Sequence, residues 1–179
     1  ILAEEGVDLL LLETFADLDE LLVAARLAAA TSLPVLASMA FDAEGFTAAG
    51  LSASTAGAAL ARLPLAGFGA NCGVGPEGIG RVAEQLAPHL RPDQLLCLMP
   101  NAGLPQRLEG RMVFGSRPDY FAASAERLLA SGANIVGGCC GSGPGHIAAL
   151  AGTIGDRPPC SRGAKAPAAA AKPPTAERR

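Results

Sequence analysis

The sequence predicts an α/β protein built from repeated strand–helix units, and three observations support this fold class. Five short runs rich in Leu, Val and Ile recur along the chain. The runs are continuous rather than alternating in hydrophobicity, as expected for parallel strands that are buried on both faces. Segments with helical spacing separate them, and successive runs begin about 26 to 39 residues apart, close to the roughly 30 residues of a βαβ unit.

The predicted strands and helices alternate along the chain. The five strands comprise residues 7–14 (VDLLLLET), 33–39 (LPVLASM), 65–72 (LAGFGANC), 94–101 (QLLCLMPN) and 133–140 (ANIVGGCC). Apolar residues recur at helical spacing after Asp17, after Glu77 and after Arg117. In the third of these helices, Pro118 suits the first turn and Gly132 suits the C-terminal cap.

Repeated units of this kind build either a doubly wound open sheet or a (β/α)8 TIM barrel. A complete barrel takes about 250 residues, whereas this chain has 179 and begins in a helix-like segment without Met. We therefore expect residues 1–156 to be the C-terminal five or so βα units of an incomplete barrel. We also expect the N-terminal units to be present in a longer protein, because the fragment alone would leave strand edges uncovered.

The composition changes near residue 157. Residues 157–179 consist largely of Pro, Ala and basic residues and contain no large apolar side chain. This composition predicts a disordered linker or tail, since it offers nothing to bury in a core. A tether of this kind often leads to another domain.

Charge and cysteine usage exclude several classes of protein. The formal net charge of −3 gives no reason to expect nucleic acid or an anionic membrane as a partner. No apolar stretch approaches the roughly 20 residues that a bilayer-spanning helix needs. Five cysteines without regular spacing argue against a disulfide-stapled secreted domain, and we expect a cytoplasmic protein.

Polar or thiol groups follow each of the five predicted strands. In α/β proteins of both kinds, functional residues lie at the C-terminal ends of the strands. The groups found there are Glu13 and Thr14, Ser38, Asn71 and Cys72, Asn101, and Cys139 with Cys140. This end of the sheet is therefore the predicted functional face.

Three of these groups are cysteines, which suggests a catalytic zinc site with three thiolates and one open position. Adjacent strand residues normally point to opposite faces, but glycines on both sides of Cys139 and Cys140 allow the backbone to leave the pleat. Two other interpretations are open: buried cysteines that act as small apolar residues, or a vicinal disulfide. Cys97, in the middle of an apolar run, is expected to be a core residue.

Four stretches of the chain resemble the zinc-dependent homocysteine S-methyltransferase domain. This domain occurs in cobalamin-dependent methionine synthase, in betaine–homocysteine methyltransferase and in reductase-fused homologues. The similar stretches match the family in content and order across about residues 1–155, and they are LLLETF (10–15), GANCGVGPE (69–77), PNAGLP (100–105) and GGCCGSGPGHI (137–147). The last departs mildly from the usual Thr-rich, Glu-containing version, and the family's glycine-rich first strand is absent here.

The resemblance implies a (β/α)8 barrel that transfers a methyl group to the thiol of homocysteine, giving methionine. It implies that Cys72, Cys139 and Cys140 bind one Zn²⁺ per chain. It also implies that Glu13 contacts the amino group of homocysteine and makes Asn101 a candidate for substrate contact. The implied methyl donor is derived from methyltetrahydrofolate or is S-methylmethionine, with cobalamin or folate reaching the site through another domain.

Two alternatives remain at this point. A phosphate-binding TIM-barrel enzyme without metal would use the glycine-rich stretch around residue 141 as an anion cradle at a helix N-terminus. A non-catalytic redox-sensing domain would use Cys139 and Cys140 as a reversibly oxidised pair. Both alternatives treat a zinc site as absent, so metal content separates them from methyl transfer.

Overall fold

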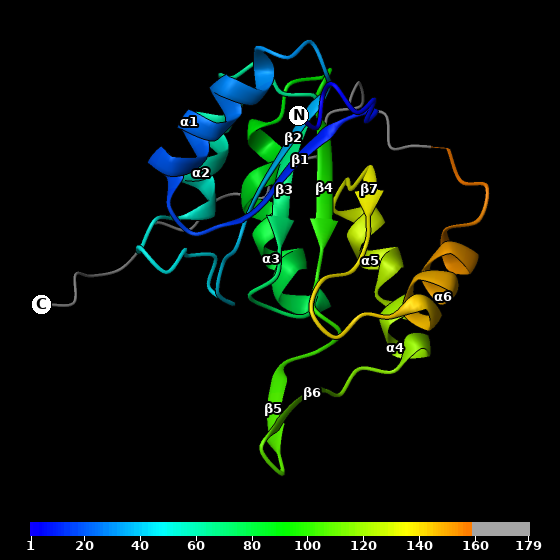
Figure 1. Cartoon of the computed structure of the whole chain (residues 1–179). Helices are drawn as coiled ribbons and strands as arrows, with labels where there is room; N and C mark the ends of the chain where they lie inside the picture. The colour runs from blue at the N-terminus through cyan, green and yellow to red at the C-terminus, as the bar shows by residue number, and fades with distance from the viewer. Residues whose placement is uncertain (159–179) are drawn as a thin grey trace, which may run out of the picture.

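The chain forms a parallel sheet with helices packed on one of its faces and a hairpin that projects from one end (Figure 1). The computed structural model describes residues 1–158. The strands are β1 (Leu10–Phe15), β2 (Val35–Met39), β3 (Gly67–Asn71), β4 (Leu95–Met99), β5 (Pro105–Leu108), β6 (Arg111–Phe114) and β7 (Ile135–Val136). The helices are α1 (Leu18–Ala29), α2 (Ala53–Leu60), α3 (Pro76–Leu86), the 3₁₀ turn η1 (Ala87–His89), α4 (Pro118–Ala123), α5 (Ala125–Ala130) and α6 (Pro144–Ile154).

The sheet order distinguishes a barrel from a doubly wound fold. The order is β1-β2-β3-β4-β7, and every neighbouring pair is parallel. A doubly wound sheet reverses its strand order at a switch point, whereas a barrel adds each new strand on the same side. All five predicted strands are present and lie side by side in the order of the chain, and together they form an incomplete barrel.

Local sequence signals explain where the helices begin and end. The Asp17 carboxylate caps α1 by accepting a hydrogen bond of 2.9 Å from the Glu20 N–H. The third predicted helix is divided into α4 and α5 at Ser124, whose hydroxyl donates back to the Phe121 carbonyl oxygen at 2.6 Å. Pro118 opens α4, and Gly132 has a φ of +90° just beyond α5, as predicted.

The hydrophobic core lies between the helices and the outer face of the sheet. Phe68, Leu96 and Leu98 point from β3 and β4 into this layer and are fully buried. The inner face carries smaller groups, because the register aligns Ser38 of β2 with Gly69 of β3, and Gly69 with Cys97 of β4. Bulk thus fills the outer layer and space is left on the inner side.

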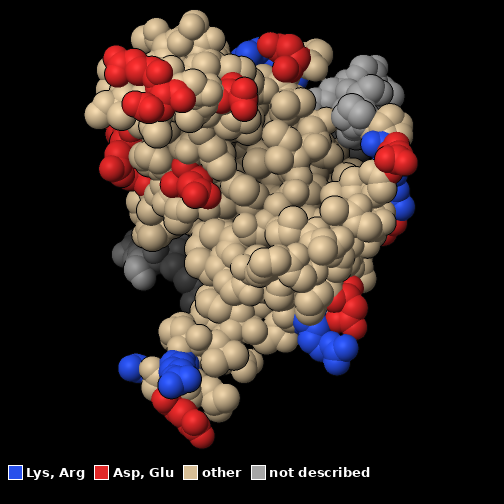
Figure 2. Space-filling view, turned by 45° about the vertical axis from the view of Figure 1, so that its right-hand side comes forward, with Lys and Arg blue, Asp and Glu red and all other residues tan. Residues whose placement is uncertain are grey.

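The hairpin β5–β6 extends past the C-terminal ends of the sheet strands (Figure 1). Its tip carries charged residues of both signs, and Figure 2 shows these at the lower end of a face whose middle is broadly uncharged. Within residues 1–158, no helix is both long and apolar enough to cross a membrane. Arg157 forms an ion pair with Glu126, and the rest of the predicted tail, residues 159–179, lies outside the described residues.

A substitution at Gly69 tests how closely β3 and β4 approach each other. A Cβ atom at this position would overlap the carbonyl oxygen of Cys97 on the neighbouring strand. We expect Gly69→Ala to lower the free energy of unfolding of the intact protein by about 2–3 kcal/mol, because the strands would have to separate. Urea denaturation measures the change.

The matched control is Gly80→Ala in α3. An added Cβ there meets no atom within 4 Å, so the helix should gain about 0.5–1 kcal/mol. Equal denaturation midpoints for the two variants would contradict the strand spacing described here.

Candidate metal centre

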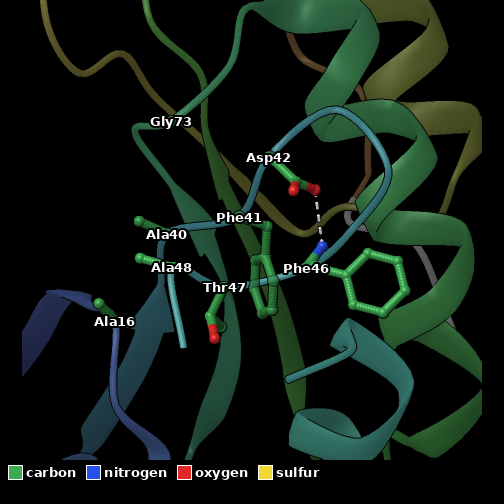
Figure 3. A pocket seen from close by; sticks show the side chains of 8 residues that line it. All are labelled: Ala16, Ala40, Phe41, Asp42, Phe46, Thr47, Ala48 and Gly73. Atoms are coloured by element: carbon green, nitrogen blue, oxygen red, sulfur yellow. Dashed lines mark hydrogen bonds between the residues drawn. The ribbon is translucent and has the colours of Figure 1, made fainter. Parts of the chain in front are cut away.

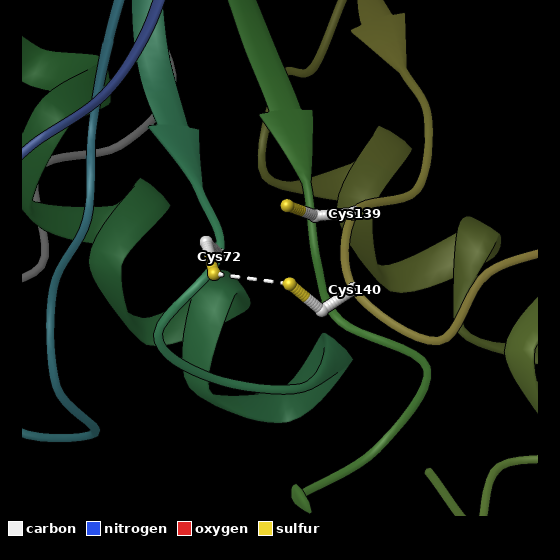
Figure 4. A group of neighbouring side chains, drawn as sticks. All are labelled: Cys72, Cys139 and Cys140. Carbon is white, nitrogen blue, oxygen red and sulfur yellow. Dashed lines mark hydrogen bonds between the residues drawn. The ribbon is translucent and has the colours of Figure 1, made fainter. Parts of the chain in front are cut away.

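Three cysteines from distant parts of the chain converge at the C-terminal end of the sheet (Figure 4). Cys72 directly follows β3, while Cys139 and Cys140 follow β7. The three sulfur atoms lie within 4.8 Å of one another, and those of Cys72 and Cys140 are 3.6 Å apart. The described cysteines are free thiols. The structure thus brings together the three side chains that the sequence singled out.

Backbone hydrogen bonds between neighbouring loops hold these residues in place. Cys72 adopts a left-handed φ of +60°, and its N–H donates to the Met99 carbonyl oxygen at 3.1 Å. The N–H of Cys139 donates to the carbonyl oxygen of Pro100 at 2.8 Å, and the Cys140 carbonyl oxygen accepts from Ala102 at 2.8 Å. The bonds of Cys72 and Cys139 continue the strand pairing past the strand ends, whereas Cys140 lies in a turn. This change of conformation between Cys139 and Cys140 explains how two adjacent residues reach one site.

Two buried asparagines contact the cysteine cluster. Asn71, at the end of β3, places its amide nitrogen 3.8 Å from the sulfur of Cys139. Asn101 accepts a hydrogen bond of 3.1 Å from the Cys140 N–H through its side-chain oxygen. Asn101, predicted as a substrate contact, thus lies at the site and supports the backbone of a cysteine.

Glu13 lies at the end of β1 with its side chain exposed on the inner face. Burial, with a smaller contribution from the negative charge of Glu13, raises the pKa of Cys97 to about 11. Cys97 is buried in β4, as the sequence predicted for a core residue. Cys97 shares the inner face with Ser38 and Gly69, and the charge of Glu13 acts on this thiol.

The three thiols differ in acidity. Partial burial opposes ionisation of Cys72, but hydrogen bonds from the Gly73 N–H, from the other two cysteines and from Asn101 outweigh it, so the pKa of Cys72 lies below its ordinary value. A hydrogen bond to Cys72, followed by burial and the neighbouring thiolate charges, raises the pKa of Cys140 to about 11. As the pH rises, Cys72 therefore loses its proton before Cys140 does.

The donor set suits a divalent cation of the zinc type. A tetrahedral ion with metal–sulfur bonds of about 2.3 Å places its sulfur ligands about 3.8 Å apart. The observed separations, 3.6 Å for one pair and at most 4.8 Å for the others, require only small side-chain movements to reach that spacing. Thiolates favour soft or borderline ions over Mg²⁺ or Ca²⁺, and three ligands leave one tetrahedral position for another molecule.

Two further features lie outside the cysteine cluster. A cavity of about 270 Å³ is lined by Ala16, Ala40, Phe41, Asp42, Phe46, Thr47, Ala48 and Gly73, the residue after Cys72 (Figure 3). At this cavity the Asp42 carboxylate accepts a hydrogen bond of 2.8 Å from the Phe46 N–H. His146 opens α6, since its Nδ1 accepts from the Gly143 N–H at 3.2 Å. Its Nε2 then donates to the Ser116 carbonyl oxygen at 2.9 Å. No pattern in the sequence indicated the cavity.

Fold and site together define a partial α/β barrel with three convergent cysteines at its C-terminal rim. Residues 1–154 match the family model described as homocysteine S-methyltransferase. The chain therefore belongs to the homocysteine S-methyltransferase family.

Similar proteins include methionine synthase of Mycobacterium leprae (strain TN), which is 31% identical over 156 residues covering 83% of this chain and 13% of that protein. Crystal structures of the homocysteine methyltransferase MmuM from Escherichia coli are also similar. The apo form has a TM-score of 0.66 at 27% identity and covers 85% of this chain and 51% of that one. The metallated form has a TM-score of 0.64 at 28% identity and covers 83% and 46%. The chain thus spans about half of MmuM and a small part of methionine synthase.

The order of thiol acidity predicts an order of alkylation in metal-free protein. A lowered pKa makes a thiolate available at lower pH, so iodoacetamide should modify Cys72 at pH 8, while Cys140, with a pKa of about 11, should react slowly until the pH approaches that value. Peptide mass spectrometry of samples quenched at successive times measures both rates. Faster labelling of Cys140 than of Cys72 at pH 8 would contradict the hydrogen-bond pattern.

Proposed function

We propose that the intact protein transfers a methyl group to the thiol of homocysteine, giving methionine, and that Cys72, Cys139 and Cys140 hold one Zn²⁺ per chain. The convergence of three sulfurs within 4.8 Å is the observation that carries this proposal. Membership of the homocysteine S-methyltransferase family and the similarity to a metallated methyltransferase structure support it.

The chemistry divides between the ion and the side chains around it. Bound Zn²⁺ would keep the substrate sulfur deprotonated at neutral pH, since a thiol coordinated to zinc loses its proton. The three cysteines supply the anionic ligands, and Asn101 fixes the backbone of one of them. A general base is then unnecessary, which agrees with a chain that contains only two histidines.

Glu13 is the proposed partner of the substrate's ammonium group. Its carboxylate is exposed on the inner face of the sheet, where the layer formed by Ser38, Gly69 and Cys97 leaves room for a small amino acid. An ion pair there would orient homocysteine so that its thiol faces the cysteine cluster, a contribution of proximity and orientation. Asn101 is the second proposed substrate contact. Its amide nitrogen carries two N–H groups, one for the Cys72 sulfur and one for the substrate.

The methyl donor is proposed to be methyltetrahydrofolate-derived or S-methylmethionine. The similarity to methionine synthase, of which this chain covers 13%, supports a donor module elsewhere in a longer protein. Cobalamin or folate would then act through that module. We propose neither nucleic acid nor a membrane as a partner, and a cytoplasmic location stays a prediction from cysteine usage.

The two alternative functions make different use of the same residues. A phosphate-binding barrel would not need three convergent sulfurs, and a redox pair would need only Cys139 and Cys140. Neither alternative explains why the sulfur of Cys72, which follows a different strand, lies 3.6 Å from the sulfur of Cys140. We therefore favour methyl transfer.

Zinc content tests the ligand set directly. Cys72→Ser, Cys139→Ser and Cys140→Ser should each reduce bound zinc from about one per chain to a small fraction, because a lost thiolate removes one of three protein ligands. Elemental analysis of the purified intact protein provides the measurement. Cys97→Ser is the control and should retain its metal, since this thiol is buried in β4 away from the cluster.

Steady-state kinetics test the substrate. The intact protein should convert homocysteine to methionine with at least one donor from a panel of methyltetrahydrofolate, methylcobalamin and S-methylmethionine. Glu13→Gln should raise the KM for homocysteine by about 10- to 100-fold, because a charge-assisted contact of about 1.5–3 kcal/mol is lost, and should leave the zinc content unchanged. A variant with an unaltered KM would remove Glu13 from the proposed site.

A further inference from the structure

Asn71 connects the two parts of the proposed site. Its side chain is fully buried at the end of β3, directly before Cys72. The side-chain oxygen accepts hydrogen bonds of 2.8 Å from the Thr14 N–H and 2.8 Å from the Ser38 hydroxyl. The amide nitrogen donates to the Thr14 hydroxyl at 2.6 Å and to the Cys139 sulfur at 3.8 Å. Both lone pairs and both N–H groups of the amide therefore have partners.

The orientation of this amide is unambiguous. A backbone N–H can only donate, so the atom that faces the Thr14 N–H must be the side-chain oxygen of Asn71. The NH₂ group must then face the Thr14 hydroxyl and the Cys139 sulfur. Asn71 thus presents a fixed donor to one of the three proposed metal ligands.

The other end of the network holds an irregular stretch of β1. Leu12 pairs with Ala37, but the next pair is Phe15 with Met39, so β1 advances three residues while β2 advances two. Thr14, in this bulge, has a φ of +64°, which is costly for a β-branched residue. Bulges of this kind redirect side chains next to active sites, and Glu13 directly precedes Thr14 in this one.

We propose that Asn71 is a positioning residue that joins the two halves of the site. Its amide holds the β1 bulge that directs Glu13 and, through the same group, donates to the sulfur of Cys139. The inference rests on the proposed function, because the two groups that Asn71 connects are a proposed zinc ligand, Cys139, and the proposed substrate-binding carboxylate, Glu13. A thiolate is a stronger acceptor than a thiol, so the N–H···S bond withdraws electron density from Cys139 and tightens when a metal ion is bound.

The first test uses Asn71→Asp in the intact protein at pH 8. An ionised carboxylate still accepts from Thr14 and Ser38 but offers no N–H to the sulfur. We expect zinc affinity, measured by competition with a chelator, to fall by about 10- to 100-fold. In the Co²⁺-loaded protein without homocysteine, the sulfur-to-cobalt charge-transfer band should move to lower energy, since Cys139 becomes more electron-rich.

Ser38→Ala is the matched control for this change. It removes a hydrogen bond to the same asparagine oxygen but leaves the NH₂ group in place. The cobalt band of this variant should coincide with that of the unaltered protein. A shifted band in Ser38→Ala, or an unshifted band with unchanged zinc affinity in folded Asn71→Asp, would overturn the proposal.

The second test examines the link between Asn71 and Glu13 independently of the metal ligands. Thr14→Val keeps the backbone N–H and the size of the side chain but removes the hydroxyl that receives the asparagine N–H. The bulge should loosen, and the KM for homocysteine should rise by about two- to tenfold, the cost of one hydrogen bond, with kcat nearly unchanged. An unchanged KM overturns the proposal even if Asn71→Asp does not fold, as judged by circular dichroism.

These outcomes are distinguishable from failure of the proposed function. If the unaltered protein binds no Co²⁺ or Zn²⁺, or does not methylate homocysteine, the proposed function itself is wrong. If the unaltered protein does both and the two variants behave like it, only the role of Asn71 is wrong.

Discussion

The hydrogen-bonded register between β3, β4 and β7 is the constraint on which the metal centre depends. Asn71 pairs with Met99, and Leu98 pairs with Val136, so the ends of the three strands lie level with one another. The bonds from Cys72 to Met99 and from Cys139 to Pro100 continue that pairing beyond the strands. Cys72 and Cys140 are 68 positions apart in sequence. A slip of one residue in either pairing would turn the sulfurs to opposite faces.

The same register also aligns small residues on the inner face, where the substrate is proposed to bind. Ser38, Gly69 and Cys97 occupy one layer across β2, β3 and β4, and their small side chains keep the inner face shallow. The outer face of these strands carries Phe68 and the leucines that pack against the helices. At this level of β3 and β4, the outer side therefore packs against the helices, whereas the inner side carries small groups.

The sheet was predictable from sequence because its strands are continuous apolar runs, whose buried character does not depend on distant partners. The cysteines were predictable as a site because they stand at strand ends. Helix α2 was missed, since a segment of Ala, Ser, Thr and Gly has little contrast between its faces. The hairpin β5–β6 was missed because nearly all its residues are exposed. Its signal was the Glu109–Gly110 turn, where both residues have positive φ, as a two-residue hairpin requires.

The contacts of Asn71 were beyond reach of the sequence for a different reason. Its partners, Thr14, Ser38 and Cys139, belong to three other segments of the chain, and only the folded sheet brings them to one amide. The bulge in β1 is similarly invisible, because "LLLETF" reads as a regular strand. Sequence patterns report which face of an element is buried, whereas a buried polar network depends on the distances between elements.

The two halves of the site differ in how they are supported. The cysteines are fixed by β3, β4 and β7 and by the loops that follow them, all of which pair with one another within residues 1–158. Glu13 lies on β1, which among the described residues pairs with β2 alone. The position of Glu13 therefore depends more heavily on side-chain contacts, among them the hydrogen bonds between Asn71 and the neighbouring Thr14. Of the two proposed properties, metal binding by the cysteines should accordingly tolerate substitution better than placement of the substrate by Glu13.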